Sequence, residues 1–160
     1  MKTLGYIDRV PRLLGVQAEG ARPIVDAFSS GKDLVPSSTR TLADSIAVGT
    51  PRNWRRAIQQ IRSSDGDMVA VTDDEILSAM RMTARLGGVF GEPAGVAGIA
   101  GLQEAVRQNI IRSNETVLVV ITGNGLKDIQ SAQQTAGQAL SIEPTLDALA
   151  ESLSAHSIPH

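Results

Sequence analysis

Three short apolar runs divide the chain and predict buried strands. They are Leu13–Ala18, Met68–Val71 and Val117–Ile121. Each run is continuous rather than alternating, and all three contain the β-branched residue valine. That pattern is typical of strands buried on both faces of a parallel sheet.

Helical patterns fill the intervals between these runs. At Thr72, the stretch "TDDE" places a threonine three residues before a glutamate, which predicts a capping box at the start of a helix that Gly87-Gly88 ends. Strands that alternate with helices predict an α/β fold with a parallel sheet. The expected helices are Gly20–Phe28, Asn53–Arg62, Thr72 to Leu86, Ala94–Ile111 and a short amphipathic helix beginning at Pro144.

The predicted sheet is incomplete. A doubly wound sheet usually has about five or six strands, and only three runs qualify here. We therefore expect residues 1–160 to form a single incomplete domain, flanked by helices. Residues 129–160 are expected to form a Gln- and Ala-rich tail that ends in the short helix.

Composition narrows the class of protein. The 160 residues suit one domain, 42% of them are hydrophobic, and the formal net charge of −2 gives no electrostatic reason to expect nucleic acid or an anionic membrane as partner. No cysteine is present, which excludes disulfides and thiolate metal sites. No signal peptide or membrane-spanning run is visible, so we expect a soluble, cytoplasmic protein.

Several kinds of chemistry are disfavoured by the residues available. The only histidines are His156 and His160 at the end of the chain, which argues against a histidine-based triad or metal site. The "SSGKD" around Lys32 lacks the spacing of a phosphate-binding loop. The carboxylates Asp73 to Glu75 stand at a helix start, where capping explains them better than catalysis.

The stretch "TGNGLKD" follows the third predicted strand. Thr122 ends that strand, and ligands of α/β proteins bind beyond the carboxyl ends of strands, where a hydroxyl can bond a ring nitrogen. The Gly-x-Gly of Gly123 and Gly125 is weak evidence for phosphate binding. Composition alone favours the alternative, a strand-terminal threonine followed by a plain glycine turn.

Two further stretches are rich in small residues. In "GEPAGVAGIAG" (Gly91–Gly101), Glu92 is either a helix cap or a site residue, and the glycines allow a backbone or a flat ligand to approach. In "LADSIAVGTPRNW" (Leu42–Trp54), Gly49 would allow a close approach to a planar ring. Tight helix–sheet packing and an ordinary connection are the respective alternatives.

Taken in order, these stretches resemble the C-terminal part of threonine synthase. The series is "LGYIDRVPRLLGVQAEGARPIVDAF", "TLADSIAVGTPRNWRRAI", "VAVTDDEIL", "GVFGEPAGVAGIAGL" and "ETVLVVITGNGLKD", and it covers about Leu4 to Asp128. Threonine synthase is a pyridoxal-phosphate enzyme of the tryptophan synthase β-like, or fold type II, group. The resemblance implies the C-terminal part of that fold's large domain.

The resemblance also implies a function and residue roles. The cofactor would be pyridoxal 5′-phosphate. The reaction, a lyase step of threonine biosynthesis, would convert O-phospho-L-homoserine and water to L-threonine and phosphate through a cofactor aldimine. Thr122 would bond the pyridine nitrogen, Gly123 would shape the turn beside the ring, and Ala47, Val48 and Gly49 would contact the ring. Glu92 resembles a glutamate near the cofactor in related enzymes.

The sequence departs from the family in one large respect. The Schiff-base lysine, the phosphate-binding loop and most substrate residues belong to an N-terminal half that we expect this chain to lack. Its lysines, Lys2, Lys32 and Lys127, do not suit the role of a desolvated catalytic amine. We therefore expect the chain alone to be inactive and to need an N-terminal complement or a homo-oligomer.

Two alternatives remain open. The chain could be a non-catalytic binding or assembly module that kept the fold and lost the chemistry. It could instead be a segment of a related threonine dehydratase or cysteine synthase, although those relatives more often present serine at the ring-nitrogen position.

Overall fold

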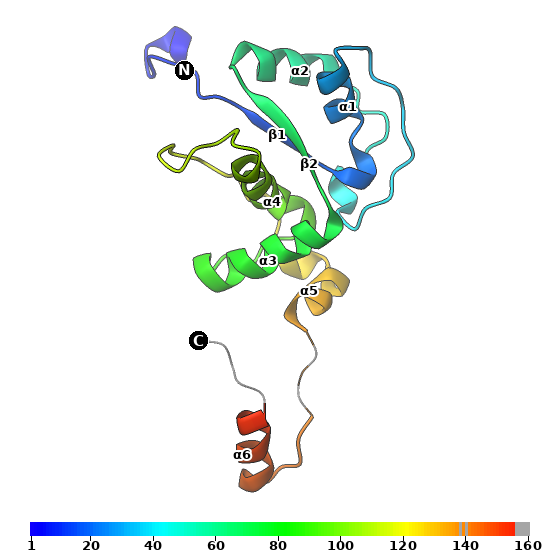
Figure 1. The fold of residues 1–160 in the computed structure, drawn as a ribbon, viewed down its shortest axis with the longest axis vertical. Helices are drawn as coiled ribbons and strands as arrows, with labels where there is room; N and C mark the ends of the chain where they lie inside the picture. The colour runs from blue at the N-terminus through cyan, green and yellow to red at the C-terminus, as the bar shows by residue number, and fades with distance from the viewer. Residues whose placement is uncertain (138, 140, 156–160) are drawn as a thin grey trace.

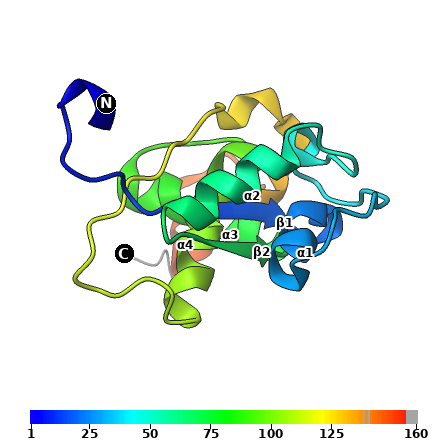
Figure 2. The same ribbon diagram turned by 90° about the horizontal axis from the view of Figure 1, so that it is seen from above.

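The computed structural model describes residues 1–137, 139 and 141–155. Its sheet has two parallel strands, β1 (Leu14–Ala18) and β2 (Asp67–Val71), with Val16 opposite Val69 and Ala18 opposite Val71. Helices cover both faces (Figures 1 and 2). The predicted α/β class, a partial parallel sheet flanked by helices, is therefore confirmed.

Six α-helices and four 3₁₀ turns surround or follow the sheet in the described part of the chain. Helices α1 and α2 pack on one face, while α4 packs on the other with α3 alongside it. The α-helices are α1 (Pro23–Ser30), α2 (Trp54–Ser63), α3 (Asp73–Gly87), α4 (Pro93–Arg107), α5 (Ile129–Ala136) and α6 (Leu146–Ala155). The 3₁₀ turns are η1 (Lys2–Leu4), η2 (Glu19–Ala21), η3 (Asp44–Ile46) and η4 (Gly125–Lys127).

The predicted start of α3 is confirmed at the level of single hydrogen bonds. The Thr72 hydroxyl accepts from the Glu75 amide at 3.2 Å, and the Glu75 carboxylate accepts from the Thr72 amide at 2.8 Å. The helix ends before Gly88, whose φ of 65° is the left-handed conformation that glycine adopts without strain. Two other boundaries shift: α1 begins at Pro23, after η2, and α4 ends at Arg107.

The small residues of α4 serve close packing. A side chain at Gly95 would lie 2.9 Å from the Gly123 amide nitrogen, one at Gly98 would lie 3.0 Å from Val119, and one at Gly101 would lie 2.2 Å from Val16. Neighbouring segments approach α4 closely because α4 has almost no side chains on this surface. At Gly95 the close neighbour is a backbone, whereas at Gly98 and Gly101 it is a valine side chain, so the tight packing given as the alternative for this stretch is also present.

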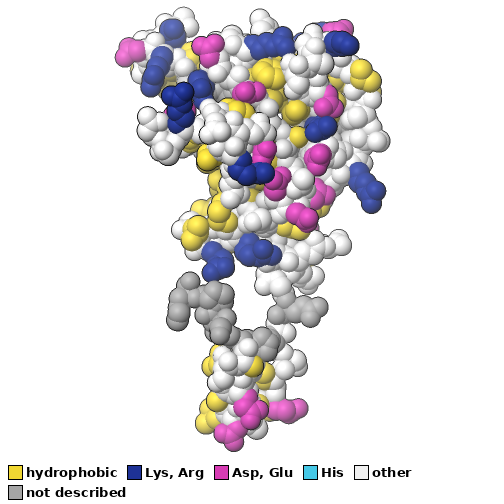
Figure 3. Space-filling model, in the orientation of Figure 1, with side chains coloured by type: hydrophobic (Ala, Val, Ile, Leu, Met, Phe, Trp, Pro, Cys, Tyr) yellow, Lys and Arg dark blue, Asp and Glu magenta, His cyan; other side chains and the backbone are white. Residues whose placement is uncertain are grey.

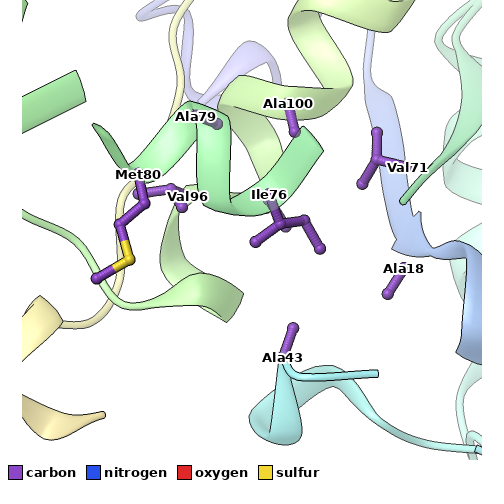
Figure 4. Close-up of a cluster of buried hydrophobic side chains, with 9 residues drawn as sticks. Ala18, Ala43, Val71, Ile76, Ala79, Met80, Val96 and Ala100 are labelled. Atoms are coloured by element: carbon purple, nitrogen blue, oxygen red, sulfur yellow. The ribbon is translucent and has the colours of Figure 1, made fainter. Parts of the chain in front are cut away.

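The main core lies where α3, α4 and the strand ends meet. Ile76 and Met80 of α3 are fully buried, as is Val96 of α4 (Figure 4). With only 2% aromatic residues in the chain, aliphatic side chains fill this space. The cluster comprises Ala18, Ala43, Val71, Ile76, Ala79, Met80, Val96, Ala97 and Ala100.

The prediction of a third strand at Val117–Ile121 was wrong. No partner strand is hydrogen-bonded to it in the described part of the chain, and a strand requires such a partner. The run still alternates as a strand would: Val119 and Ile121 are partly buried against α4, whereas Leu118 and Val120 are 89% and 69% exposed. The segment has the side-chain pattern of a strand without the pairing.

The tail contains one helix that was expected and one that was not. Helix α5 packs on α3, where the Thr135 carbonyl accepts from Arg81 Nε at 3.0 Å and the Thr135 hydroxyl donates to the Met80 sulfur at 3.3 Å. The expected short helix is α6, which has no buried residue and carries hydrophobic and acidic side chains on its surface (Figure 3). His156 and His160 lie outside the described residues.

Among the described helices, none has the length and apolar character needed to cross a membrane.

The close packing of α4 yields a test of stability. We expect Gly95→Ala to lower the free energy of unfolding by about 1–3 kcal/mol, because the new methyl group meets backbone atoms that cannot swing away. Gly87→Ala, at the end of α3 with no atom within 4 Å of the added group, is the matched control and should be neutral or slightly stabilising. Urea denaturation followed by circular dichroism measures both, and equal effects would contradict the packing.

Candidate functional site

Two backbone hydrogen bonds join the start of α4 to the turn that follows Thr122. The Glu92 amide donates to the Gly123 carbonyl at 2.9 Å, and the Gly125 amide donates to the Phe90 carbonyl at 2.9 Å. Together they form an antiparallel bridge that is not part of the sheet. The bridge holds the "GEP" and "TGNG" stretches side by side, although they are far apart in the sequence.

The Glu92 side chain lies directly on Gly123. A β-carbon at Gly123 would fall 1.9 Å from Glu92 Oε1, so the carboxylate occupies this position only because Gly123 has no side chain. Glu92 is 7% exposed, and its Oε2 lies 3.2 Å from the Lys127 ammonium nitrogen. A nearly buried carboxylate needs such a partner, because an unpaired buried charge is costly.

The glycine turn uses its own amides. Besides the Gly125 bond, the Leu126 amide donates to Asn124 Oδ1 at 2.9 Å, the Lys127 amide to the Asn124 carbonyl at 3.0 Å, and the Asp128 amide to the Gly125 carbonyl at 3.3 Å. A phosphate-cradling loop instead points consecutive free amides at its ligand. With the Glu92 carboxylate beside it as well, this turn is unsuited to bind a phosphate.

Thr122 is an exposed residue of this candidate site without a hydrogen-bonding partner for its side chain among the described residues. A side chain at Gly95 would lie 3.4 Å from the Thr122 amide, so the bare surface of α4 supports the backbone here. The geometry therefore presents a neutral donor and acceptor to a ligand, next to a buried carboxylate.

The second candidate segment, Ala47 to Gly49, follows η3. Ala47 is partly buried and Val48 is 44% exposed. Packing explains why position 49 is a glycine, since a β-carbon there would lie 1.9 Å from the Ser37 carbonyl oxygen. The Ser37 amide also donates to the Gly49 carbonyl at 3.1 Å. The backbone that approaches Gly49 is thus that of Ser37.

The two candidate segments are linked through α4 and the core. Turn η3 contacts α4, and Ile46 packs against the same buried cluster as Ile121. The structure brings Glu92, Gly123 and Thr122 together directly. It relates Ala47, Val48 and Gly49 to them only through these shared supports.

Sequence reasoning missed two features of the site. Lys127 lies on the surface with a 66% exposed side chain, and its pairing with Glu92 was not predicted. The capping of α5 was also missed: the Asp128 carboxylate accepts from the Ser131 amide at 2.9 Å and from the Ser131 hydroxyl at 2.6 Å. The Asp-x-x-Ser spacing was the available signal for this cap.

All three lysines of the chain lie on the surface. Lys2 belongs to η1, Lys32 follows α1, and Lys127 pairs with Glu92. A lysine that acts as a nucleophile must be deprotonated, which burial or a neighbouring cation promotes. None of the three stands in such surroundings.

The comparisons identify the family. The model of the pyridoxal-phosphate-dependent enzyme family matches residues 1–123. The chain belongs to this family. Its cofactor is pyridoxal 5′-phosphate, as the resemblance implied.

Two curated relatives agree with the resemblance to threonine synthase. The threonine synthase of Methanocaldococcus jannaschii is 40% identical over 91% of this chain, and that of Mycobacterium leprae is 44% identical over 80% of it. The chain spans only 36% and 34% of the length of those two proteins.

Two solved structures share the fold. Threonine synthase from Escherichia coli has a TM-score of 0.66 at 22% identity, over 89% of this chain and 32% of that one. Maize serine racemase has a TM-score of 0.61 at 20% identity, over 97% of this chain and 42% of that one.

The cap at Asp128 yields a test by pH. The hydrogen bonds from Ser131 lower the pKa of Asp128 below its ordinary value of 3.8. Because the folded-state pKa is depressed, the cap's contribution to stability is complete above pH 3.8 and is lost as the pH falls through the lower, folded-state pKa. An NMR titration of the carboxyl carbon should give a midpoint below 3.8 in the wild type. Ser131→Ala should raise that midpoint, and an unchanged midpoint would contradict this origin.

Proposed function

We propose that this chain forms the ring-binding side of the active site of a threonine synthase. The reaction is the conversion of O-phospho-L-homoserine and water to L-threonine and phosphate. The observation that carries the proposal is the exposed Thr122 hydroxyl. It is free of hydrogen bonds to the described residues, and the next residue, Gly123, is held by the hydrogen bond from the Glu92 amide. The 38–44% identity to threonine synthases supports this reaction.

The residues present fit the pyridine end of the cofactor. A ring nitrogen needs one hydrogen-bonding partner, and Thr122 offers a hydroxyl that is otherwise unused. A neutral hydroxyl, unlike a carboxylate, does not hold the ring nitrogen protonated. The cofactor, when bound, supplies an electron sink, and a threonine partner keeps that sink moderate, which suits elimination and replacement chemistry.

The neighbouring groups have complementary roles in this proposal. Glu92, neutralised by Lys127, fixes the backbone at Gly123 and hence the direction of Thr122. Ala47 and Val48 offer a small apolar surface against which a planar ring packs and from which water is excluded. Gly49, held by Ser37, sets the course of that segment.

The remainder of the site belongs to a partner in this proposal. Residues 1–160 form one incomplete domain with a tail over 129–160, and the surface lysines do not suit the Schiff-base role. The phosphate-binding loop and the catalytic lysine would come from an N-terminal complement. The unpaired run Val117–Ile121, with its exposed Leu118 and Val120, is the segment to which a strand of that complement would add.

The proposal predicts inactivity of the chain alone. We expect no threonine from O-phospho-L-homoserine and pyridoxal phosphate with the purified chain. We expect activity when the unmatched part of the Methanocaldococcus jannaschii threonine synthase is added as a separate polypeptide. Threonine formation by the chain alone would contradict the need for a partner. Preferred turnover of threonine or O-acetylserine by the complemented pair would favour a dehydratase or cysteine synthase instead.

A charge on the unpaired run tests how the complement binds. Leu118→Lys should abolish complementation, because a charge would enter the pairing surface. Leu86→Lys is the matched control, since Leu86 is 82% exposed at the end of α3 and Leu118 is 89% exposed. Titration of the complement against each variant measures the difference, and equal activity of the two variants would show that Val117–Ile121 is not the docking segment.

A further inference from the structure

The segment that carries Ala47 to Gly49 lies in a long connection. Between the end of α1 at Ser30 and the start of α2 at Trp54, the only regular structure is η3. The connection's own backbone hydrogen bonds join residues within it and do not tie it to the sheet, and such loops in compact domains are usually functional. Its position must therefore be fixed by contacts to the rest of the molecule.

One acidic side chain makes two of these contacts. The Asp73 carboxylate accepts from the Thr41 hydroxyl at 2.5 Å through Oδ1 and from the Leu42 amide at 3.1 Å through Oδ2. The Thr41 hydroxyl oxygen in turn accepts from the Ala43 amide at 3.2 Å. Asp73 thus orders three consecutive residues, just before η3.

Capping of α3 does not account for Asp73. The capping box is made by Thr72 and Glu75, and both Asp73 oxygens point to the loop. Asp74, the next residue, is exposed and makes no such contact to the described residues. Asp73 and Asp74 therefore place similar charge at the same helix end, but only Asp73 binds the loop.

The contacts lie where a ligand of this fold would be expected. Asp73 comes one residue after Thr72, which follows the carboxyl end of β2, and a second loop contact joins the Arg40 amide to the Gly20 carbonyl at 2.9 Å, beyond the end of β1. The carboxyl edge of a parallel sheet is the general position of ligand sites in α/β proteins. The loop is thus laid across that edge.

From the residues that Asp73 orders, the chain enters the core at Ala43 and then leads to Ala47–Gly49, the segment expected to contact the cofactor ring. Ala43 is 1% exposed and faces Ile76, near Ala18 and Val71 (Figure 4). Ile46, three residues on, packs against the same cluster. Because η3 has only three residues, a displacement of Ala43 would also displace Ala47.

We propose that Asp73 is a positioning residue for the cofactor site. Its carboxylate holds Thr41 and Leu42 so that Ala47, Val48 and Gly49 face the cofactor ring. This inference rests on the proposed function, since it assigns the ring surface to that segment. Hydrogen bonds to a carboxylate are stronger than neutral ones, and removal of the acceptor leaves the Leu42 amide and the Thr41 hydroxyl without a partner.

The first test measures the loop itself. In Asp73→Ala, we expect amide hydrogen exchange over residues 42–49 to accelerate about tenfold or more, with the β2 amides unchanged. Asp74→Ala removes the same helix-end charge and should leave exchange at wild-type rates. Asp73→Asn should fall between them, because an amide oxygen can still accept from the Leu42 amide. Thr41→Val removes one of the two contacts and serves if Asp73→Ala fails to fold.

The second test measures the cofactor surface. The probe is 4′-deoxypyridoxine 5′-phosphate, which has no aldehyde and so cannot react with lysine. We expect Asp73→Ala to weaken its binding about tenfold in a fluorescence titration. Asp74→Ala should bind as the wild type does, and Asp73→Asn should restore part of the affinity.

The outcomes separate this inference from the proposed function. Wild-type exchange rates in Asp73→Ala, or equal acceleration in both alanine variants, would overturn the role of Asp73. Faster exchange with unchanged probe affinity would show a tether that does not serve the cofactor, which also overturns it. If the wild type binds no probe, ring binding by this chain fails, and the exchange data alone still decide whether Asp73 holds the loop.

Discussion

The antiparallel bridge between Gly91 and Asn124 is the interaction on which the candidate site depends. It joins two segments that the sequence separates, and its two hydrogen bonds of 2.9 Å fix the turn immediately after Thr122. Two glycines make the bridge possible: Gly123 leaves room for the Glu92 carboxylate, and Gly95 leaves room for the Gly123 backbone. Lys127 then neutralises a carboxylate that burial would otherwise make costly.

The small sheet organises the second half of the site. Strands β1 and β2 end beside each other, and the loop that leads to Ala47 crosses their carboxyl edge. Two contacts hold it there: the Gly20 carbonyl accepts from the Arg40 amide, and the Asp73 carboxylate accepts from Thr41 and Leu42. Thr122 lies beside α4, and η3, which immediately precedes Ala47, contacts the same helix, so the polar group and the apolar segment share one support.

Local sequence signals predicted most of the helices and both strands of the sheet. The capping box at Thr72 and the glycines after α3 act within a few residues, and their outcome matched the prediction. The run Val117–Ile121 shows the limit of such signals, because its composition specifies a strand but pairing needs a neighbour that local sequence does not supply. The missed helix α5 is stabilised by its contacts with α3 rather than by a strong apolar pattern of its own.

The sequence suggested residues for the candidate site but not the contacts among them. The resemblance to threonine synthase pointed to Thr122, Glu92 and Gly49, and the structure gives a packing reason for the glycine at 49 that the sequence could not. The Glu92–Lys127 ion pair and the contacts of Asp73 with Thr41 and Leu42 join distant parts of the chain. No periodicity or local motif encodes such long-range pairs.

The central claim is that Thr122 and its neighbours face the ring of pyridoxal phosphate. The most direct measurement is a titration of the ¹⁵N-labelled chain with millimolar pyridoxal phosphate, followed through its amide resonances. We expect the largest shifts at residues 122–125, at Gly91 and Glu92, and at Ala47 to Gly49. Shifts that centre elsewhere, for instance on the loop around Lys32, would contradict it.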